Sequence, residues 1–188
     1  MPRYTLQRLD KKRHDRKRFT CGNDDLDGYL HKTARQAGDA GRAVCYVLID
    51  SGDPGRIAGY FTLTQHAVDP GPENTALFER QPGIARTLAV PTTLLGRLAV
   101  DRDYQGAGLG SALLAQALEI SLAAADVVAS TAVVVDPIDA RARAFYEGFG
   151  FELLNGETER LFMTMNTVAA HFDRVDLGAI EATGDAGE

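Results

Sequence analysis

The chain has 188 residues, of which 45% are hydrophobic and 24% are charged, a balance typical of a globular protein with a substantial core. We expect a single domain over residues 1–176 and a flexible acidic tail over residues 177–188, where glycine, alanine and acidic residues predominate. The two cysteines, Cys21 and Cys45, fit neither the paired spacing of a zinc site nor the density of a disulfide scaffold. The composition therefore predicts no metal site and favours a reducing, cytoplasmic environment.

The formal net charge of −6 argues at first against a polyanionic partner, but the charges are unevenly distributed. Residues 1–18 contain eight basic and two acidic residues, a net charge of +6, which leaves −12 for the rest of the chain. This basic segment is either an ordinary solvated surface or a binding patch for phosphates. The N-terminus has no apolar export signal, and polar residues interrupt the longest apolar run, residues 122–135. We therefore expect neither export nor membrane insertion.

The first part of the chain predicts a strand, a helix and a hairpin. Residues 4–9 alternate in polarity like a short strand. Asn23 can cap a helix that has three aspartates in its first turn and apolar residues at helical spacing up to Ala37. Residues 43–50 and 57–68 then resemble two strands, because the glycines and proline between them can reverse the chain.

The second part predicts alternating strands and helices. Residues 70–92 mix turn signals with one short helical stretch and carry no definite prediction. The next elements are a strand at 94–100, a helix at 109–125 and a β-branched strand at 127–135, whose continuous apolarity indicates burial on both faces. A short helix at 139–150 and a hairpin formed by 151–154 and 160–165 around the turn 155–158 complete the order. This order predicts an α/β or α+β domain with a mixed sheet.

The turn between strand 94–100 and helix 109–125 is rich in glycine. Gly106, Gly108 and Gly110 leave backbone N–H groups uncovered at a helix N-terminus, which suits a phosphate or pyrophosphate. A dinucleotide-binding fold requires a different glycine spacing close to the first strand, and a P-loop requires a lysine that is missing here. By spacing alone, a tight turn without a ligand remains the alternative.

Residues 105–110 have the form Gln/Arg-x-x-Gly-x-Gly/Ala and resemble the GCN5-related N-acetyltransferase (GNAT) superfamily. The surrounding residues 95–114 strengthen this resemblance, and residues 142–152 resemble the family's second cofactor-flanking helix. The resemblance covers residues from about 4 to 165. It implies a mostly antiparallel mixed sheet flanked by helices, in which the strands at 97–100 and 129–135 splay apart to hold acetyl-CoA.

Residues 14–36, 58–63 and 94–101 resemble one branch of this superfamily, the acetyltransferase toxins of bacterial toxin–antitoxin pairs. These toxins acetylate the amino acid carried on charged tRNA. The resemblance therefore implies charged tRNA as substrate, blocked translation as the outcome, and a separately encoded antitoxin whose disordered tail lies across the active site. Dimers are frequent in the superfamily, so it also implies a homodimer.

The resemblance implies roles for backbone groups. The N–H groups from Gly106 to Ser111 would hold the pyrophosphate, because glycine permits close approach of the backbone. Backbone groups of Leu98 and Val100 would pair with the pantetheine arm, and an amide there would polarise the thioester carbonyl. Simple core packing is the alternative for these strand residues. The expected cofactor-binding residues are Leu98, Ala99, Val100, Gln105, Gly106, Ala107, Gly108, Leu109, Gly110 and Ser111.

Tyr146 matches the tyrosine that the family places near the sulfur as general acid. Complete proton transfer from a phenol with a pKa of about 10 to a thiolate with a pKa of about 8.5 is uphill by roughly 2 kcal/mol. We therefore expect a strong hydrogen bond with partial transfer. The alternative is that Tyr146 packs beside Phe145 and Phe149.

No histidine or glutamate stands out as a general base, and the four histidines are interpreted as surface or capping residues: His14, His31, His66 and His171. An α-amino group with a pKa of about 7.7–8.0 is largely neutral near pH 7.5, whereas a lysine needs roughly 4 kcal/mol to lose its proton. This difference favours an α-amine acceptor, in agreement with aminoacyl-tRNA.

Contacts to tRNA require cations. We expect them from the basic segment, at Lys11, Lys12, Arg13, Arg16, Lys17 and Arg18, with Arg80, Arg86, Arg141 and Arg143 as further candidates. Two other functions stay open. The same chemistry could act on a small amine or a protein N-terminus, or the chain could be a non-catalytic CoA-binding module.

Overall fold

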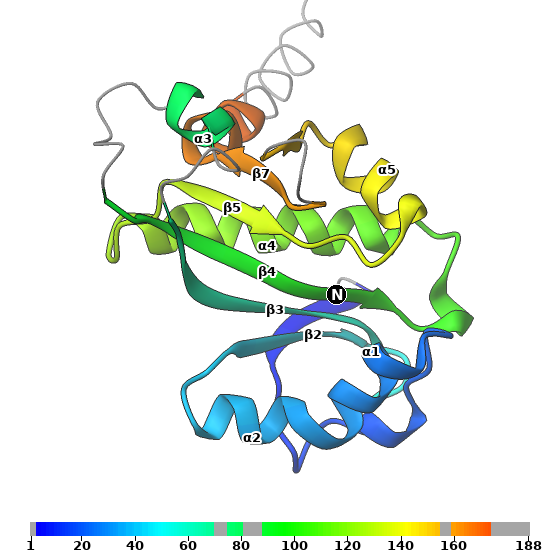
Figure 1. The fold of residues 1–188 in the computed structure, drawn as a ribbon. Coiled ribbons are helices and arrows are strands. Elements are labelled where there is room, and N and C mark those ends of the chain that lie inside the picture. Colours follow the sequence, from blue (N-terminus) through cyan, green and yellow to red (C-terminus); the bar gives the residue numbers. More distant parts are fainter. Residues whose placement is uncertain (1–2, 70–74, 81–87, 155–158, 174–188) are drawn as a thin grey trace, which may run out of the picture. The chain divides into compact units, whose positions relative to one another are not determined.

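The computed structural model describes residues 3–69, 75–80, 88–154 and 159–173, and its strands form a seven-stranded sheet in the order β1-β2-β3-β4-β5-β7-β6 (Figure 1). The pairs β1–β2, β2–β3, β5–β7 and β6–β7 are antiparallel. The predicted fold class, a mixed sheet with helices, is thus confirmed. The strands are β1 (Tyr4–Arg8), β2 (Val44–Asp50), β3 (Ile57–Val68), β4 (Val90–Val100), β5 (Ala132–Val135), β6 (Glu152–Leu153) and β7 (Leu161–Thr164).

The helical segments follow the predicted order, with a short helix in the connection that had no definite prediction. They are η1 (Arg16–Arg18), α1 (Asp24–Gly28), η2 (Tyr29–Thr33), α2 (Ala34–Asp39), α3 (Thr75–Arg80), η4 (Arg102–Tyr104), α4 (Leu109–Ala125) and α5 (Ala140–Gly148). None of the helices in the described part of the chain is long and apolar enough to span a membrane.

The described residues form two compact units, one within Met1–Gln65 and Leu94–Ala117 and the other within His66–Thr93 and Leu118–Glu188. The single domain over residues 1–176 stays a prediction. The proposed tail, residues 177–188, and the turn at 155–158 lie outside the described residues.

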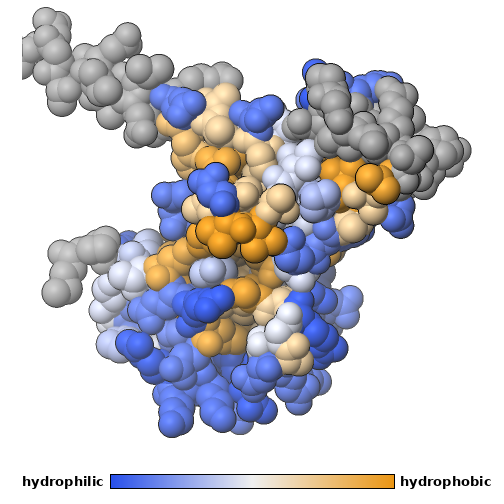
Figure 2. Space-filling view, turned by 90° about the vertical axis from the view of Figure 1, so that its left-hand side faces the viewer, coloured by the Kyte–Doolittle hydropathy of each residue, from blue (hydrophilic) through white to orange (hydrophobic). Residues whose placement is uncertain are grey.

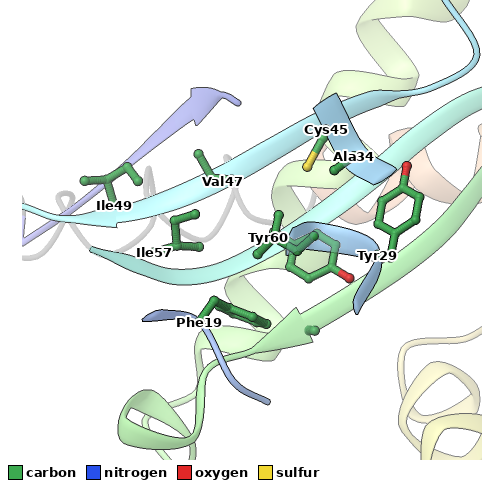
Figure 3. Close-up of a cluster of buried hydrophobic side chains, with 10 residues drawn as sticks. Phe19, Tyr29, Ala34, Cys45, Val47, Ile49, Ile57 and Tyr60 are labelled. Atoms are coloured by element: carbon green, nitrogen blue, oxygen red, sulfur yellow. The ribbon is translucent and has the colours of Figure 1, made fainter. Parts of the chain in front are cut away.

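In the first unit, one face of the sheet packs against α1, η2 and α2. Alternate residues of β2 point to the same side, and there they join a buried cluster with aromatic residues from β3 and the helices (Figure 3). Ala99 brings the C-terminal end of β4 into this cluster. Its members are Phe19, Tyr29, Leu30, Ala34, Cys45, Val47, Ile49, Ile57, Tyr60 and Ala99.

The opposite face of the same strands packs against α4 at Gly59. A Cβ atom at Gly59 would lie 2.6 Å from Leu113 Cδ1 and 3.0 Å from the carbonyl oxygen of Ala99. Only glycine therefore allows α4 to lie this close to β3. The glycine loop leads directly into α4. The contact of Gly59 with Leu113 therefore also positions the N-terminal part of α4, where the loop ends.

The predicted first helix is present but is interrupted by a π-helical turn, η2. Its start is as expected, because the Asn23 side chain accepts hydrogen bonds from the N–H groups of Asp25 and Leu26. At the wider turn, Arg16 Nη1 donates to the carbonyl oxygens of Leu30 (3.4 Å) and His31 (2.9 Å). A π-turn changes the backbone hydrogen-bonding pattern, and Arg16 satisfies these carbonyls from a distant part of the chain.

Three strand boundaries differ clearly from the prediction, and the first is that β4 begins at Val90 rather than at residue 94. All four residues of β5 are buried, as expected of a central strand, but residues 127–131 are not part of it. The N–H groups of Val127 and Val128 instead bond to the carbonyl of Ala124 at the end of α4, and both side chains are exposed. The predicted strand at 160–165 ends at Thr164, where a helix over residues 165–173 begins. The Thr164 hydroxyl accepts a hydrogen bond from Thr167 N and caps this helix.

Some large apolar side chains of the described residues are exposed, and Figure 2 shows apolar areas between polar residues on the face that it displays. The most exposed of these side chains are Val127, Leu88, Ile138 and Val128.

Candidate functional site

The loop between β4 and α4 has an open surface. Gly106 and Gly108 have φ values of +79° and +76°, and a Cβ atom built on either would meet no atom within 4 Å. The backbone conformation, rather than crowding, therefore requires glycine here. The first N–H groups of α4, from Leu109 onward, have no acceptor within the helix. Open space, exposed N–H donors and the positive end of a helix fit an anionic pyrophosphate.

The positive φ of Gly108 predicts that replacing it by alanine has a larger effect than the same replacement at Gly28. Gly108→Ala is expected to lower stability by about 1–2 kcal/mol, because an L-residue is strained at positive φ. It is also expected to raise the KM for acetyl-CoA. Gly28→Ala in α1 is the control, because Gly28 has an ordinary helical φ of −60° and likewise nothing within 4 Å of its Cβ position. Thermal unfolding measures the stability of both variants, and steady-state kinetics measure their KM for acetyl-CoA. Equal stability and equal KM of the two variants would contradict the role of positive φ.

A buried ion pair anchors the start of the loop. The Asp101 carboxylate is fully buried and accepts hydrogen bonds from Arg56 Nη2 (2.9 Å), Thr20 N (2.9 Å) and Asp103 N (3.1 Å). Arg56 is also buried and donates to Asp103 Oδ2 (2.7 Å) and to the carbonyl of Arg18 (2.6 Å). The ion pair thus joins the β2–β3 turn, the segment before α1 and the end of β4. Sequence reasoning missed it, because Arg56 and Asp101 are 45 positions apart.

Gln105 also positions the loop. Its Nε2 donates to the carbonyl oxygens of Val100 (3.0 Å) and Cys21 (3.1 Å). The side chain therefore connects the loop to the end of β4 and to the segment before α1. Its predicted contact with the cofactor stays a prediction.

The strand residues expected to bind the cofactor divide by burial. Ala99 is a member of the buried cluster, so its side chain packs in the core. Leu98 and Val100 are half-buried. Because successive side chains of a strand alternate between faces, Leu98 and Val100 point away from the cluster.

Tyr146 lies in the second unit, in α5. Asp139 caps this helix by accepting a hydrogen bond from Ala142 N at 2.7 Å. The Tyr146 side chain is 8% exposed, and its ring makes edge contacts with Phe145 and Phe151. Packing of the ring is thus present, although Phe151 rather than Phe149 is the second neighbour.

The hydroxyl group of Tyr146 is chemically distinct from its packed ring. No described residue hydrogen-bonds to Tyr146 Oη, and burial alone raises the pKa of this phenol to about 12. A phenol in this environment keeps its proton at neutral pH and has it free to share. Tyr146 can therefore act as a hydrogen-bond or proton donor.

The cations expected to contact tRNA fall into two groups. Lys11, Lys12, Arg13 and Lys17 are exposed. Lys11 and Arg13 also line an open groove of about 640 Å³ with Arg8 and Arg35, in which Asp10 and Asp39 are the acidic residues. Arg16 holds the π-turn carbonyls, and Arg18 forms an exposed ion pair with Asp53 at 3.0 Å.

Two of the four further cations form ion pairs. Arg80 pairs with Glu152. Arg143 pairs with Glu147 and Glu159. Arg141 is exposed, and Arg86 lies outside the described residues.

Three histidines have local hydrogen-bonding roles. His14 is buried, and burial lowers its pKa. Its Nδ1 accepts a hydrogen bond from Asp10 N at 3.0 Å. His31 Nε2 lies 2.9 Å from the carbonyl oxygen of Phe19, and His66 Nε2 lies 2.9 Å from Arg160 Nη1. His171 is exposed. These positions agree with the interpretation of histidines as capping or surface residues, although His14 is more buried than expected.

Comparison with known proteins gives a consistent result. The family described as "Acetyltransferase (GNAT) family" matches residues 7–151. A tRNA-acetylating toxin of Mycobacterium tuberculosis is 33% identical over 170 residues, which cover 90% of this chain and 98% of that protein. A tyrosine-to-phenylalanine mutant of the toxin AtaT, bound to the C-terminus of the antitoxin AtaR and acetyl-CoA, has a TM-score of 0.76 and 25% identity, with 91% and 99% of the chains covered. AtaT complexed with acetyl-methionyl-tRNAfMet has a TM-score of 0.77 and 26% identity, with 90% and 99% covered.

Proposed function

Since the chain belongs to the acetyltransferase (GNAT) family, we propose that it transfers the acetyl group of acetyl-CoA to the α-amino group of the amino acid on a charged tRNA. The predicted acetyltransferase and its cosubstrate acetyl-CoA are confirmed by the family and by solved relatives that hold this molecule. What we propose beyond the family is the acceptor, the α-amino group on charged tRNA. The observation that carries it is the 33% identity with a tRNA-acetylating toxin over 98% of that toxin's length.

The residues of the first unit provide the binding half of the reaction. Bound acetyl-CoA supplies a thioester whose carbonyl carbon an amine attacks, so that a C–N bond forms, the C–S bond breaks and CoA leaves as a thiolate. The N–H groups from Gly106 to Ser111 hold the pyrophosphate. Backbone groups of Leu98 and Val100 bind the pantetheine arm, and an amide there stabilises the negative charge that develops on the carbonyl oxygen.

Tyr146 provides the donor for the leaving thiolate. No described residue hydrogen-bonds to its hydroxyl, and its pKa is raised to about 12, which supports a strong hydrogen bond to the sulfur rather than complete proton transfer. The α-amino group needs little help from a base, because its pKa of about 8 leaves a large neutral fraction near neutral pH. The absence of a recognisable base among the described residues is therefore compatible with this acceptor.

Transfer to charged tRNA removes the free amine that peptide-bond formation needs, so the activity would inhibit translation in the cytoplasm. A cell that makes such an enzyme needs a neutralising partner. AtaT is bound to the C-terminus of the antitoxin AtaR in the similar structure, and we propose a separately encoded antitoxin for this chain as well. A homodimer stays a prediction.

The proposal is tested by incubating the purified protein with radiolabelled acetyl-CoA and a total pool of aminoacylated tRNA. We expect label on charged tRNA but not on the same pool after deacylation, since only the aminoacyl group has an α-amine. Label that appears only on small amines or protein N-termini, with none on tRNA, would show that the acceptor is not charged tRNA. Cofactor binding without release of CoA to any acceptor would indicate a non-catalytic module.

The basic segment predicts a second result. Changing Lys11, Lys12 and Arg13 together to glutamate is expected to lower kcat/KM for charged tRNA at least 100-fold, because these exposed cations would bind phosphates. The difference in kcat/KM between the variant and the unmodified protein should become smaller at higher salt concentration, because salt weakens the binding of tRNA to the unmodified protein. Acetylation of an amino-acid ester without phosphates is the control and should change less than about twofold. An equal loss with both acceptors would contradict a tRNA contact.

A further inference from the structure

Arg97 differs from the other buried or half-buried arginines of the first unit. Its guanidinium carbon lies 3.7 Å from the centroid of the Tyr29 ring, a close face contact. Arg16 donates to backbone carbonyls and Arg56 to carboxylates, as described above. No carboxylate or carbonyl in the described part of the chain accepts a hydrogen bond from Arg97. Arg97 is thus a half-buried cation whose N–H donors have no acceptor among the described residues.

The aromatic support beneath Arg97 is rigid. Tyr29 is 9% exposed, and its ring stacks on Tyr60 with an interplanar angle of 14° (Figure 3). The Tyr60 hydroxyl in turn donates to the carbonyl of Leu26 at 2.8 Å. Both rings belong to the buried cluster, so the guanidinium rests on a surface that cannot easily move. Stacking leaves the planar edge of the guanidinium, with its five N–H donors, available for an anion.

Arg97 is adjacent in β4 to the residues that bind the thioester arm. It shares a strand face with Ala99, toward α1 and η2, whereas Leu98 and Val100 point to the other face. An anion held by Arg97 therefore lies on the helical side of the strand, within one residue of the backbone of Leu98. A cation that donates no hydrogen bond to the described part of the chain suits an acceptor that brings its own negative charge.

The chemistry of the acceptor identifies this anion. In charged tRNA the carboxyl group of the amino acid is esterified and carries no charge, so the nearest negative charge is the phosphodiester before the terminal nucleotide. We propose that Arg97, supported by Tyr29, binds a phosphate at the 3′ end of the charged tRNA and so orients the α-amine toward the thioester. This inference rests on the proposed function. A guanidinium binds phosphate through two parallel hydrogen bonds, which fixes orientation as well as charge.

The test compares Arg97→Gln and Arg97→Lys with the unmodified protein on two acceptors. One acceptor is the charged tRNA that is labelled most strongly in the experiment above, and the other is the same amino acid esterified to adenosine, which has no phosphate. We expect Arg97→Gln to lower kcat/KM for charged tRNA about 10- to 100-fold, the range of a hydrogen bond to a charged group. Arg97→Lys should fall between, because it keeps the charge but loses the planar fork.

The control variant is Arg3→Gln, which removes another arginine that lies over a tyrosine ring, 5.2 Å from the Tyr4 centroid. It should behave like the unmodified protein, and unfolding temperatures of all variants verify the fold. On aminoacyl-adenosine, Arg97→Gln should differ from the unmodified protein by less than about twofold.

The other outcomes overturn the inference in distinguishable ways. An equal loss on both acceptors would show that Arg97 supports the strand instead of binding tRNA. A raised KM for acetyl-CoA would assign it to a cofactor phosphate. No change on either acceptor would show that it binds no anion in the reaction. If the unmodified protein acetylates aminoacyl-adenosine but no charged tRNA, the proposed function itself fails, and the inference with it.

Discussion

Replacing Tyr146 by phenylalanine is expected to lower kcat for acetyl transfer about 100-fold, while the KM for acetyl-CoA changes little. The expected size is that of a single positioned acid in the transition state. The hydroxyl has no hydrogen-bond partner among the described residues, so its removal should leave the packed ring and the unfolding temperature almost unchanged. Steady-state release of CoA with charged tRNA as acceptor measures the loss.

Tyr46→Phe is the control for this result. Tyr46 lies on β2, its ring stacks on Phe61, and it too loses one hydroxyl in the variant. Tyr46→Phe should retain full kcat. If Tyr146→Phe also retains full kcat, then Tyr146 only packs against Phe145 and Phe151, and the thiolate leaves without a protein donor.

The pH dependence of kcat gives an independent test of the same residue. The protonated phenol is the active form, and burial raises the pKa of Tyr146 to about 12. Activity that depends on this proton should therefore persist above pH 10, where a solvent-exposed phenol of pKa about 10 would already be half ionised. A fall in kcat centred near pH 10 that Tyr146→Phe removes would contradict the buried environment.

The second large effect is expected on stability, from Arg56→Met. The variant leaves the fully buried Asp101 carboxylate without its cation, and an uncompensated buried charge typically costs about 3–5 kcal/mol of unfolding free energy. Because Asp101 begins the loop that we propose binds the pyrophosphate, the KM for acetyl-CoA should also rise. Urea denaturation followed by circular dichroism measures the stability, and the shift should appear in the midpoint at unchanged slope.

Two further variants test whether the burial of the ion pair causes this loss of stability. Arg18→Met removes an arginine whose ion pair with Asp53 is exposed, and it should cost less than about 1 kcal/mol. The double variant Arg56→Met with Asp101→Leu should recover much of the stability, because it removes both charges. A similar loss for Arg18→Met and Arg56→Met would show that burial of the pair is unimportant.

The features that the sequence predicted well depend on residues close together in the chain. The Asn23 cap needs only the N–H groups two and three residues later. The hairpin of β2 and β3 follows from alternation and from the turn between them. The glycine loop was identified because Gly106 and Gly108 mark positive φ, which is a property of single residues.

The features that the sequence did not predict depend on distant contacts. The π-helical turn needs Arg16 to satisfy the carbonyls of Leu30 and His31, and no local spacing signals this. The β-branched residues within 127–131 predict a strand, yet the N–H groups of Val127 and Val128 bond to the carbonyl of Ala124 at the end of α4. The helix that follows β7 begins with a cap at Thr164 that the apolar pattern of the strand obscures.

The sequence by itself determined the family, the order of strands and helices and the position of the glycine turn, because these are encoded in short motifs and in local backbone preferences. Only the tertiary structure decided the state of the charged groups. Arg56 pairs with Asp101, Arg16 donates to helix carbonyls and Arg18 pairs with Asp53. Arg97, in contrast, lies over the Tyr29 ring and donates to no acceptor among the described residues. Whether a cation is structural or available to a substrate depends on which acceptors the fold brings within about 3 Å, and hydrogen bonds are too short-ranged for sequence spacing to reveal those neighbours.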